Sequence, residues 1–107
     1  MNVILFYCSW ILKTANWNFR LFINKPTTSF TTCSLEDVDF TETVLTKSIF
    51  DNCSFKNAIF ETTNLEKTDF RTSIHYMIDP ENNRLKGARF SKEGVVGLLM
   101  NYGVVIE

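Results

Sequence analysis

Residues 28–72 read TSFTT CSLED VDFTE TVLTK SIFDN CSFKN AIFET TNLEK TDFRT, a run of nine five-residue units. Every fifth residue in it is large and apolar, so that nine consecutive positions hold only Phe or Leu. A random chain of this composition would contain such a run with a probability on the order of 10⁻⁷. We expect this column to form the core, and its members are Phe30, Leu35, Phe40, Leu45, Phe50, Phe55, Phe60, Leu65 and Phe70.

A second column supports the first. Two positions before each large residue stands a small or β-branched one, and the two positions after it are polar almost throughout. A period of five fits neither the helical period of 3.6 nor the strand period of 2. It indicates a chain that turns a corner every five residues, so that four sides close a square coil of about twenty residues and coils stack about 4.8 Å apart. The predicted fold class is an all-β solenoid.

Residues 28–72 resemble the pentapeptide-repeat family, whose consensus is Ala-(Asp/Asn)-(Leu/Phe)-x-x. The clearest units are AIFET at 58–62, TNLEK at 63–67 and TDFRT at 68–72. The resemblance implies a right-handed quadrilateral β-helix. We expect it to cover residues 28–90, because Leu85 and Phe90 return in the original phase. His and Pro at positions 75 and 80 predict two degenerate sides, with a turn over 79–83.

Residues 91–107 are expected to form a short C-terminal helix cap followed by a strand. Apolar residues recur at helical spacing after Ser91, a candidate N-cap, and Gly103 suits the position just past a helix end. The predicted helix covers about 92–102, although Gly94 and Gly97 weaken it, and 104–106 would be the strand. A solenoid needs such a cap over its last coil, and the cap could also pair with a second copy.

Several C-terminal segments look like those of quinolone-resistance (Qnr- and McbG-like) members of the family: 69–73, 78–80, 84–91 and 97–99. This resemblance implies a head-to-head homodimer through the C-terminal helix. It also implies a rod that imitates B-form DNA, binds DNA gyrase or topoisomerase IV and confers quinolone resistance. The alternative is a structural or scaffold pentapeptide-repeat protein with another protein partner. The candidate dimer contacts are Val95, Leu98, Leu99 and Tyr102.

A DNA mimic requires surface acids. Residues 28–73 contain eight acids and four bases, and five of the acids fall on two adjacent sides of the predicted square: Glu36, Asp37, Asp39, Glu42 and Glu61. They form a candidate anionic partner face, whereas a formal net charge of −1 argues against direct nucleic-acid binding. The nine repeats would rise only about 11 Å, against about 34 Å for one turn of DNA. We therefore expect a dimer, or a shortened relative of the longer proteins.

Residues 1–27 depart from the clean repeat phase and are expected to form an irregular or degenerate N-terminal coil or cap. Two patterns compete there: a shifted five-residue phase from Tyr7 to Phe22, and strand-like alternation from Trp17 to Ile23. A rearranged or truncated gene is a further alternative. Neither a signal peptide nor a membrane-spanning segment is predicted, which favours the cytoplasm.

The sequence gives no sign of catalysis, a cofactor or a metal site. His75 has no nucleophile or carboxylate at a suggestive spacing, and the glycines follow no nucleotide-binding pattern. Cys33 and Cys53 stand one coil apart in the small column, where a disulfide is sterically feasible. In a reducing cytosol we expect them instead to be buried thiols. We therefore expect a binding protein rather than an enzyme.

Overall fold

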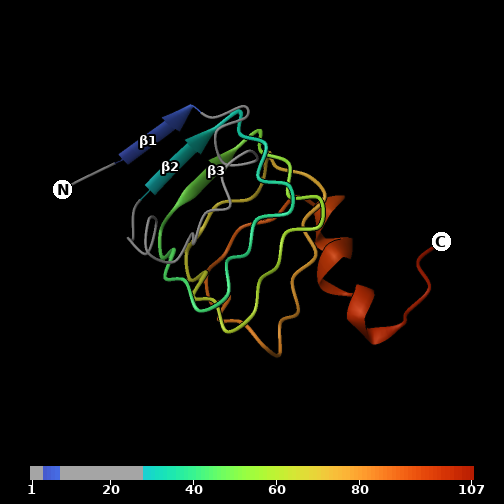
Figure 1. The fold of residues 1–107 in the computed structure, drawn as a ribbon. Coiled ribbons are helices and arrows are strands. Elements are labelled where there is room, and N and C mark those ends of the chain that lie inside the picture. The colour runs from blue at the N-terminus through green and yellow to red at the C-terminus, as the bar shows by residue number, and fades with distance from the viewer. Residues whose placement is uncertain (1–3, 8–27) are drawn as a thin grey trace.

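The computed structural model describes residues 4–7 and 28–107. Three short strands, β1 (Ile4–Tyr7), β2 (Thr28–Thr31) and β3 (Ile49–Asp51), form a parallel sheet in the order β1-β2-β3 (Figure 1). Two 3-10 helices, η1 (Gly94–Leu98) and η2 (Met100–Tyr102), follow at the C-terminal end. No helix in these described ranges is long and apolar enough to cross a membrane.

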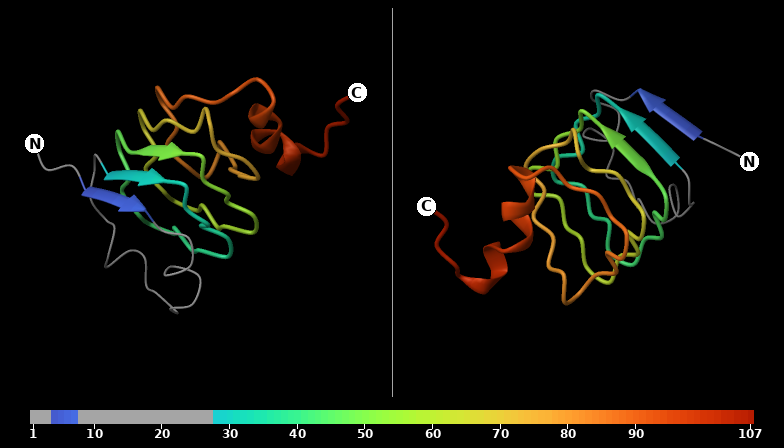
Figure 2. Two further views of the ribbon diagram at one scale, coloured as in Figure 1. Left: turned by 90° about the horizontal axis from the view of Figure 1, so that it is seen from above. Right: turned by 180° about the vertical axis from the view of Figure 1, so that it is seen from behind.

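The coils repeat every twenty residues, as the sequence predicts. In β2 and β3, Phe30 pairs with Phe50, and isolated parallel bridges join Ser34 to Ser54, Asp39 to Ile59 and Val44 to Asn64. These pairings define four sides, which we number from the one that contains β2 and β3. Figure 2 shows the coils stacked along one axis, with the C-terminal helices at the far end. The molecule is therefore a repeat β-helix.

Tight turns form the corners between sides. In most of them the small residue donates its N–H to the carbonyl of the large residue three positions earlier, as Thr43 does to Phe40 at 3.1 Å. The residue before the small one has a φ between 53° and 63°, which a type II turn requires at its third position. Its side chain is exposed at every corner concerned: Thr32, Asp37, Glu42, Lys47, Asn52, Asn57, Thr62 and Lys67.

The large column fills the interior. Eight of its nine members are fully buried, and Phe60 is 6% exposed. On the first side the rings stack one per coil, with centroids 4.8 Å apart for Phe30 and Phe50 and 5.0 Å apart for Phe50 and Phe70. Phe90 continues the stack 5.4 Å beyond Phe70. Large, nearly parallel rings at the coil spacing thus bury much apolar area along the first side.

The small column satisfies buried backbone groups between coils. The Ser73 hydroxyl accepts from the Cys53 N–H at 3.1 Å and donates to the Phe50 carbonyl at 2.6 Å. The Asn83 amide makes the same two contacts two sides later, accepting from the Thr63 N–H at 3.0 Å and donating to the Phe60 carbonyl at 3.1 Å. Short polar side chains therefore fit this column because they pair with groups that a corner would leave unpaired.

The last coil departs from the repeat in a way that the five-residue phase does not predict. His75 has a φ of 62° and is exposed, so the column position is displaced. Tyr76 (3% exposed) and Ile78 (fully buried) enter the core instead. Tyr76 packs against both Phe70 and Phe90, with ring centroids 5.4 Å away in each case. A left-handed residue at 75 has shifted the inward-facing residue by one position.

The sequence predicts one continuous helix over 92–102, but the structure has two short 3-10 helices there, η1 and η2. The strand predicted over 104–106 is wrong, because these residues form no strand. The close approach of Tyr76 gives the physical reason. A Cβ at Gly97 would lie 2.1 Å from the Tyr76 carbonyl oxygen, and one at Gly94 would lie 1.8 Å from the Tyr76 hydroxyl. The two glycines thus let η1 pack directly on the last coil, and Leu98 contacts the core from it.

Candidate functional site

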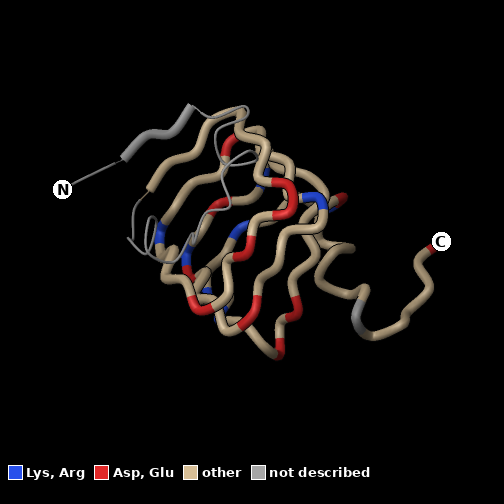
Figure 3. The backbone as a smooth tube through the Cα atoms, in the orientation of Figure 1, with Lys and Arg blue, Asp and Glu red and all other residues tan. Residues whose placement is uncertain are grey.

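The most distinctive surface feature is a row of acids along one corner of the solenoid. Positions 41–42, 61–62 and 81–82 follow one another at the corner between the third and fourth sides, because each lies twenty residues after the last. Figure 3 shows the acids of successive coils along the lower edge of the molecule. We call this row the acidic edge, and it consists of Asp39, Glu42, Glu61, Asp79 and Glu81.

Local hydrogen bonds fix two of these carboxylates. Asp39 accepts from the Thr41 N–H at 2.9 Å. Asp79 accepts from the Glu81 N–H at 2.9 Å and from the Asn82 side-chain amide at 2.7 Å. Asp79 is half-buried and the other four acids of the edge are exposed. The edge therefore presents negative charge from positions that the backbone holds in place.

The acidic face predicted from the sequence divides into two groups. Asp39, Glu42 and Glu61 belong to the acidic edge, whereas Glu36 and Asp37 lie at the preceding corner, where Lys56 follows in the next coil. Asp79 and Glu81 were missed because the irregular residues 75 and 80 ended the count of charges at 73. Continuing the twenty-residue register through the break, which Leu85 and Phe90 justify, would have included them.

Bases gather at the next corner, between the fourth and first sides. We call this row the basic edge, and it consists of Lys47, Lys67, Lys86 and Arg89. Two shallow hollows of about 420 and 290 Å³ lie among these side chains. The acids nearest to them bind other residues: Glu66 pairs with Arg84 at 3.6 Å, and Asp69 pairs with Arg71 at 2.8 Å. The two charged edges flank the fourth side (Figure 3).

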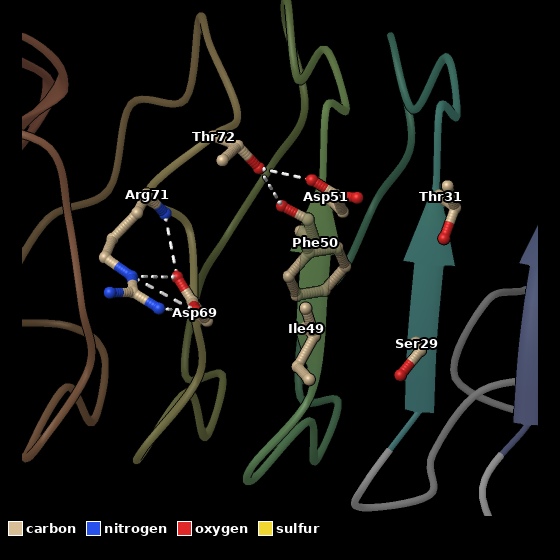
Figure 4. A pocket seen from close by; sticks show the side chains of 8 residues that line it. All are labelled: Ser29, Thr31, Ile49, Phe50, Asp51, Asp69, Arg71 and Thr72. Atoms are coloured by element: carbon tan, nitrogen blue, oxygen red, sulfur yellow. Dashed lines mark hydrogen bonds and ion pairs between the residues drawn. The ribbon is translucent and has the colours of Figure 1, made fainter.

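A hollow of about 500 Å³ lies on the first side, over β2 and β3 (Figure 4). The Arg71 guanidinium donates to both carboxylate oxygens of Asp69, and this hydrogen bonding holds the pKa of Asp69 below its usual value. Thr72 donates to Asp51 at 2.9 Å in the same hollow. Its main charged groups thus bind one another, and the arrangement stabilises adjacent coils rather than offering a group for chemistry.

The candidate dimer residues divide at the C-terminal end. Val95 and Leu99 are each 40% exposed, and Tyr102 is 47% exposed. Leu98 instead is partly buried and packs against the core. Tyr102 lies beside the end of the acidic edge: loss of solvation, followed by the charges of Glu81 and Asp79, raises the pKa of its hydroxyl.

The column cysteines are not joined to each other. Cys53 is a free, buried thiol, and its burial raises its pKa to about 11. Cys33 is buried but takes part in a disulfide bond, so the expectation of a reduced thiol is wrong for this residue. Among the residues that the structure describes, no three His, Cys, Asp or Glu side chains lie together as a metal site would require.

The five-residue repeat of this chain matches that of a known protein family. Residues 33–71 match the family of pentapeptide repeats, in eight copies. Two solved structures of trypsin-treated variants of QnrB1, a plasmid-mediated fluoroquinolone resistance protein, are similar to the chain. They share 15% and 13% sequence identity with it over 75% and 77% of its length, with TM-scores of 0.44 and 0.36. The chain spans about half of each, 48% and 47%. No curated protein sequence matches it.

Proposed function

We propose that this chain, whose residues 33–71 are pentapeptide repeats, is a binding protein that presents its acidic edge to the cationic DNA-binding surface of a type II topoisomerase. The target would be DNA gyrase or topoisomerase IV in the cytoplasm, and the consequence would be quinolone resistance. The acidic edge carries this proposal. QnrB1 is a plasmid-mediated fluoroquinolone resistance protein, and this makes the same outcome worth testing here.

The spacing of the acids supports imitation of a nucleic acid. From Asp39 to Asp79 the edge rises two coils, or about 10 Å at strand spacing. Five carboxylates over that rise correspond to roughly one charge per 2 Å, close to the charge per about 1.7 Å of duplex DNA when both strands are counted. Because the solenoid backbone holds the acids in place, little ordering cost would oppose binding to a cationic groove.

The height of one chain is small for this role, and a homodimer would extend it. From β1 to Phe90 the first side rises four coil spacings, or about 20 Å, whereas one turn of DNA spans about 34 Å. We propose that two copies meet head to head at their C-terminal ends, with Val95, Leu99 and Tyr102 at the contact. Such a dimer would place one acidic edge on each side of the junction and roughly double the anionic length.

Gyrase supercoiling with and without ciprofloxacin tests the proposal. We expect the full chain to preserve supercoiling in the presence of the drug, and a variant with Glu42→Lys and Glu61→Lys to lose this protection. A variant with Glu36→Lys and Asp37→Lys makes the same change of net charge at the neighbouring corner. This variant should retain most of the protection against the drug. If the unmodified chain neither binds gyrase nor protects supercoiling, the proposal is overturned. If the two variants lose protection equally, the acidic edge is not the surface that binds gyrase.

The second candidate is a scaffold that binds a different protein partner. The limited height and the basic edge beside the acidic one favour it, because a uniform DNA mimic would lack such bases. Under this alternative the chain would leave gyrase activity unchanged at every concentration. A direct binding measurement against purified gyrase and topoisomerase IV separates the two candidates, since only the first predicts a complex.

A further inference from the structure

The proposed function gives the basic edge no role. Stacking its lysines in consecutive coils also costs free energy, because like charges repel. Lys47 and Lys67 occupy the same corner position in consecutive coils, about 4.8 Å apart along the axis. Like charges directly opposite one another in neighbouring strands are destabilising. The two nearest acids, Glu66 and Asp69, pair with Arg84 and Arg71. Glu66 lies among these lysines and Asp69 also attracts Arg89, so two acids offset the four bases of the edge only in part.

The fourth side brings the two charged edges into one surface. It is one repeat wide, with Glu42, Glu61 and Glu81 at one corner and Lys47, Lys67 and Lys86 at the other. Its outward residues are Val44, Asn64 and Arg84. Arg84 forms an ion pair with Glu66, a residue at the same corner as the basic edge. Between the two rows of charge, the first two coils therefore present only the uncharged Val44 and Asn64.

We infer that the fourth side binds a second copy of this chain, side by side, around a two-fold axis parallel to the solenoid axis. Rotation about such an axis exchanges the corners, so the basic edge of each copy faces the acidic edge of the other. Both contacts form at once, as a two-fold interface requires. The charges match along the whole contact because both copies have the same coil spacing, which no unrelated partner is constrained to share.

A second copy fits this surface better than a nucleic acid does. Phosphates on one DNA strand advance about 3.4 Å per nucleotide along the helix axis, whereas the lysines recur about every 4.8 Å. A polyanion broad enough to cover the fourth side would also meet the acidic edge one repeat away. The formal net charge of −1 gives no long-range attraction for DNA.

The interface is small, so we expect a weak association that depends on salt. One side of three coils falls below the roughly 1,200 Å² of total buried area that marks stable complexes. Exposed ion pairs contribute about 0.2–1 kcal/mol each and are screened at high ionic strength. We therefore expect the dissociation constant to rise at least about tenfold between ionic strengths of about 0.01 M and 1 M.

Two variants with reversed charges test the arrangement. Lys47→Glu with Lys67→Glu makes the basic edge acidic, and Glu42→Lys with Glu61→Lys makes the acidic edge basic. Each variant alone should fail to pair side by side. An equimolar mixture should pair again, because both contacts of the mixed pair then join opposite charges. Sedimentation velocity of the full chains at low and high salt measures this, with circular dichroism to verify the fold.

The head-to-head dimer suggested under the proposed function does not affect this comparison. Both variants retain Val95 and Leu99, so such a dimer would contribute equally to every sample. Restored association in the mixture alone supports the inference. A mixture that sediments like its separate components overturns it. A wild-type chain that binds a short DNA duplex through Lys47 and Lys67 without self-association also overturns it, in favour of a nucleic-acid partner. The inference stands whether or not gyrase is a target.

Discussion

Replacing Phe50 with Ala would remove the central ring of the aromatic core. Phe50 is fully buried and stacks between Phe30 at 4.8 Å and Phe70 at 5.0 Å. It also meets Phe55 edge-on at 5.1 Å and Phe40 at 6.5 Å. One substitution therefore opens a cavity that borders two coils and two sides of the square.

The expected loss is at the upper end of what a buried ring contributes. Replacing a buried Phe with Ala typically lowers the free energy of unfolding by about 3–5 kcal/mol. Paired rings add about 0.5–1.5 kcal/mol beyond area, and Phe50 loses several such pairs. We expect the free energy of unfolding to fall by about 4–5 kcal/mol. At roughly 4 °C or more per kcal/mol for a domain of this size, the midpoint of thermal unfolding should fall by at least about 15 °C.

Urea unfolding followed by far-UV circular dichroism measures this change. Phe50→Leu is the matched control, because Leu35, Leu45 and Leu65 occupy equivalent positions in other sides. It should cost no more than about 1.5 kcal/mol. A loss below about 1 kcal/mol for Phe50→Ala, or equal losses for the two variants, would refute the stacked core.

Other changes probe the cap, the small column and the buried thiol. Gly97→Ala, whose Cβ would meet the Tyr76 carbonyl oxygen at 2.1 Å, should loosen the C-terminal cap and speed amide hydrogen exchange at residues 94–99 while protection in the first coils persists. Ser73→Ala should lower the free energy of unfolding by about 1–3 kcal/mol in urea titrations, because it leaves a buried N–H and the Phe50 carbonyl without that partner. The folded state raises the pKa of Cys53 from 9.0 to about 11, so it binds the thiol proton more tightly than the unfolded chain does. Stability should therefore fall as the pH rises from 9.0 towards 11, and Cys53→Ala should remove that part of the slope.

The regular coils could be predicted from the sequence because each repeat repeats the same local choice. Each five-residue side has two buried positions, one in the small column and one in the large column, so the phase of the pattern determines which residues are buried. The last coil could not be predicted in this way. His75 adopts a left-handed conformation and moves the inward position to Tyr76, a displacement that no spacing rule reveals.

The cap shows a different limit. Val95, Leu98, Leu99 and Tyr102 have helical spacing, which predicts an α-helix, but η1 and η2 are 3-10 helices. The decisive contact is with Tyr76, which is distant in sequence and allows no side chain at Gly94 or Gly97. Tertiary contact here outweighs local periodicity. The acidic edge was only partly predictable for a related reason, since its last members follow the irregular residue 75.

Because the solenoid turns a corner every five residues, the effect of an insertion depends on its length. An insertion of twenty residues would add one whole coil and leave every later side chain on its original side. An insertion of five residues would also satisfy the turn and core pattern, yet it would rotate everything after it by a quarter turn. Glu61 and Glu81 would then leave the corner of Glu42, while the core remained filled. Such a chain would keep its fold and lose both charged edges, so its stability and its binding surfaces would respond independently to the same kind of change.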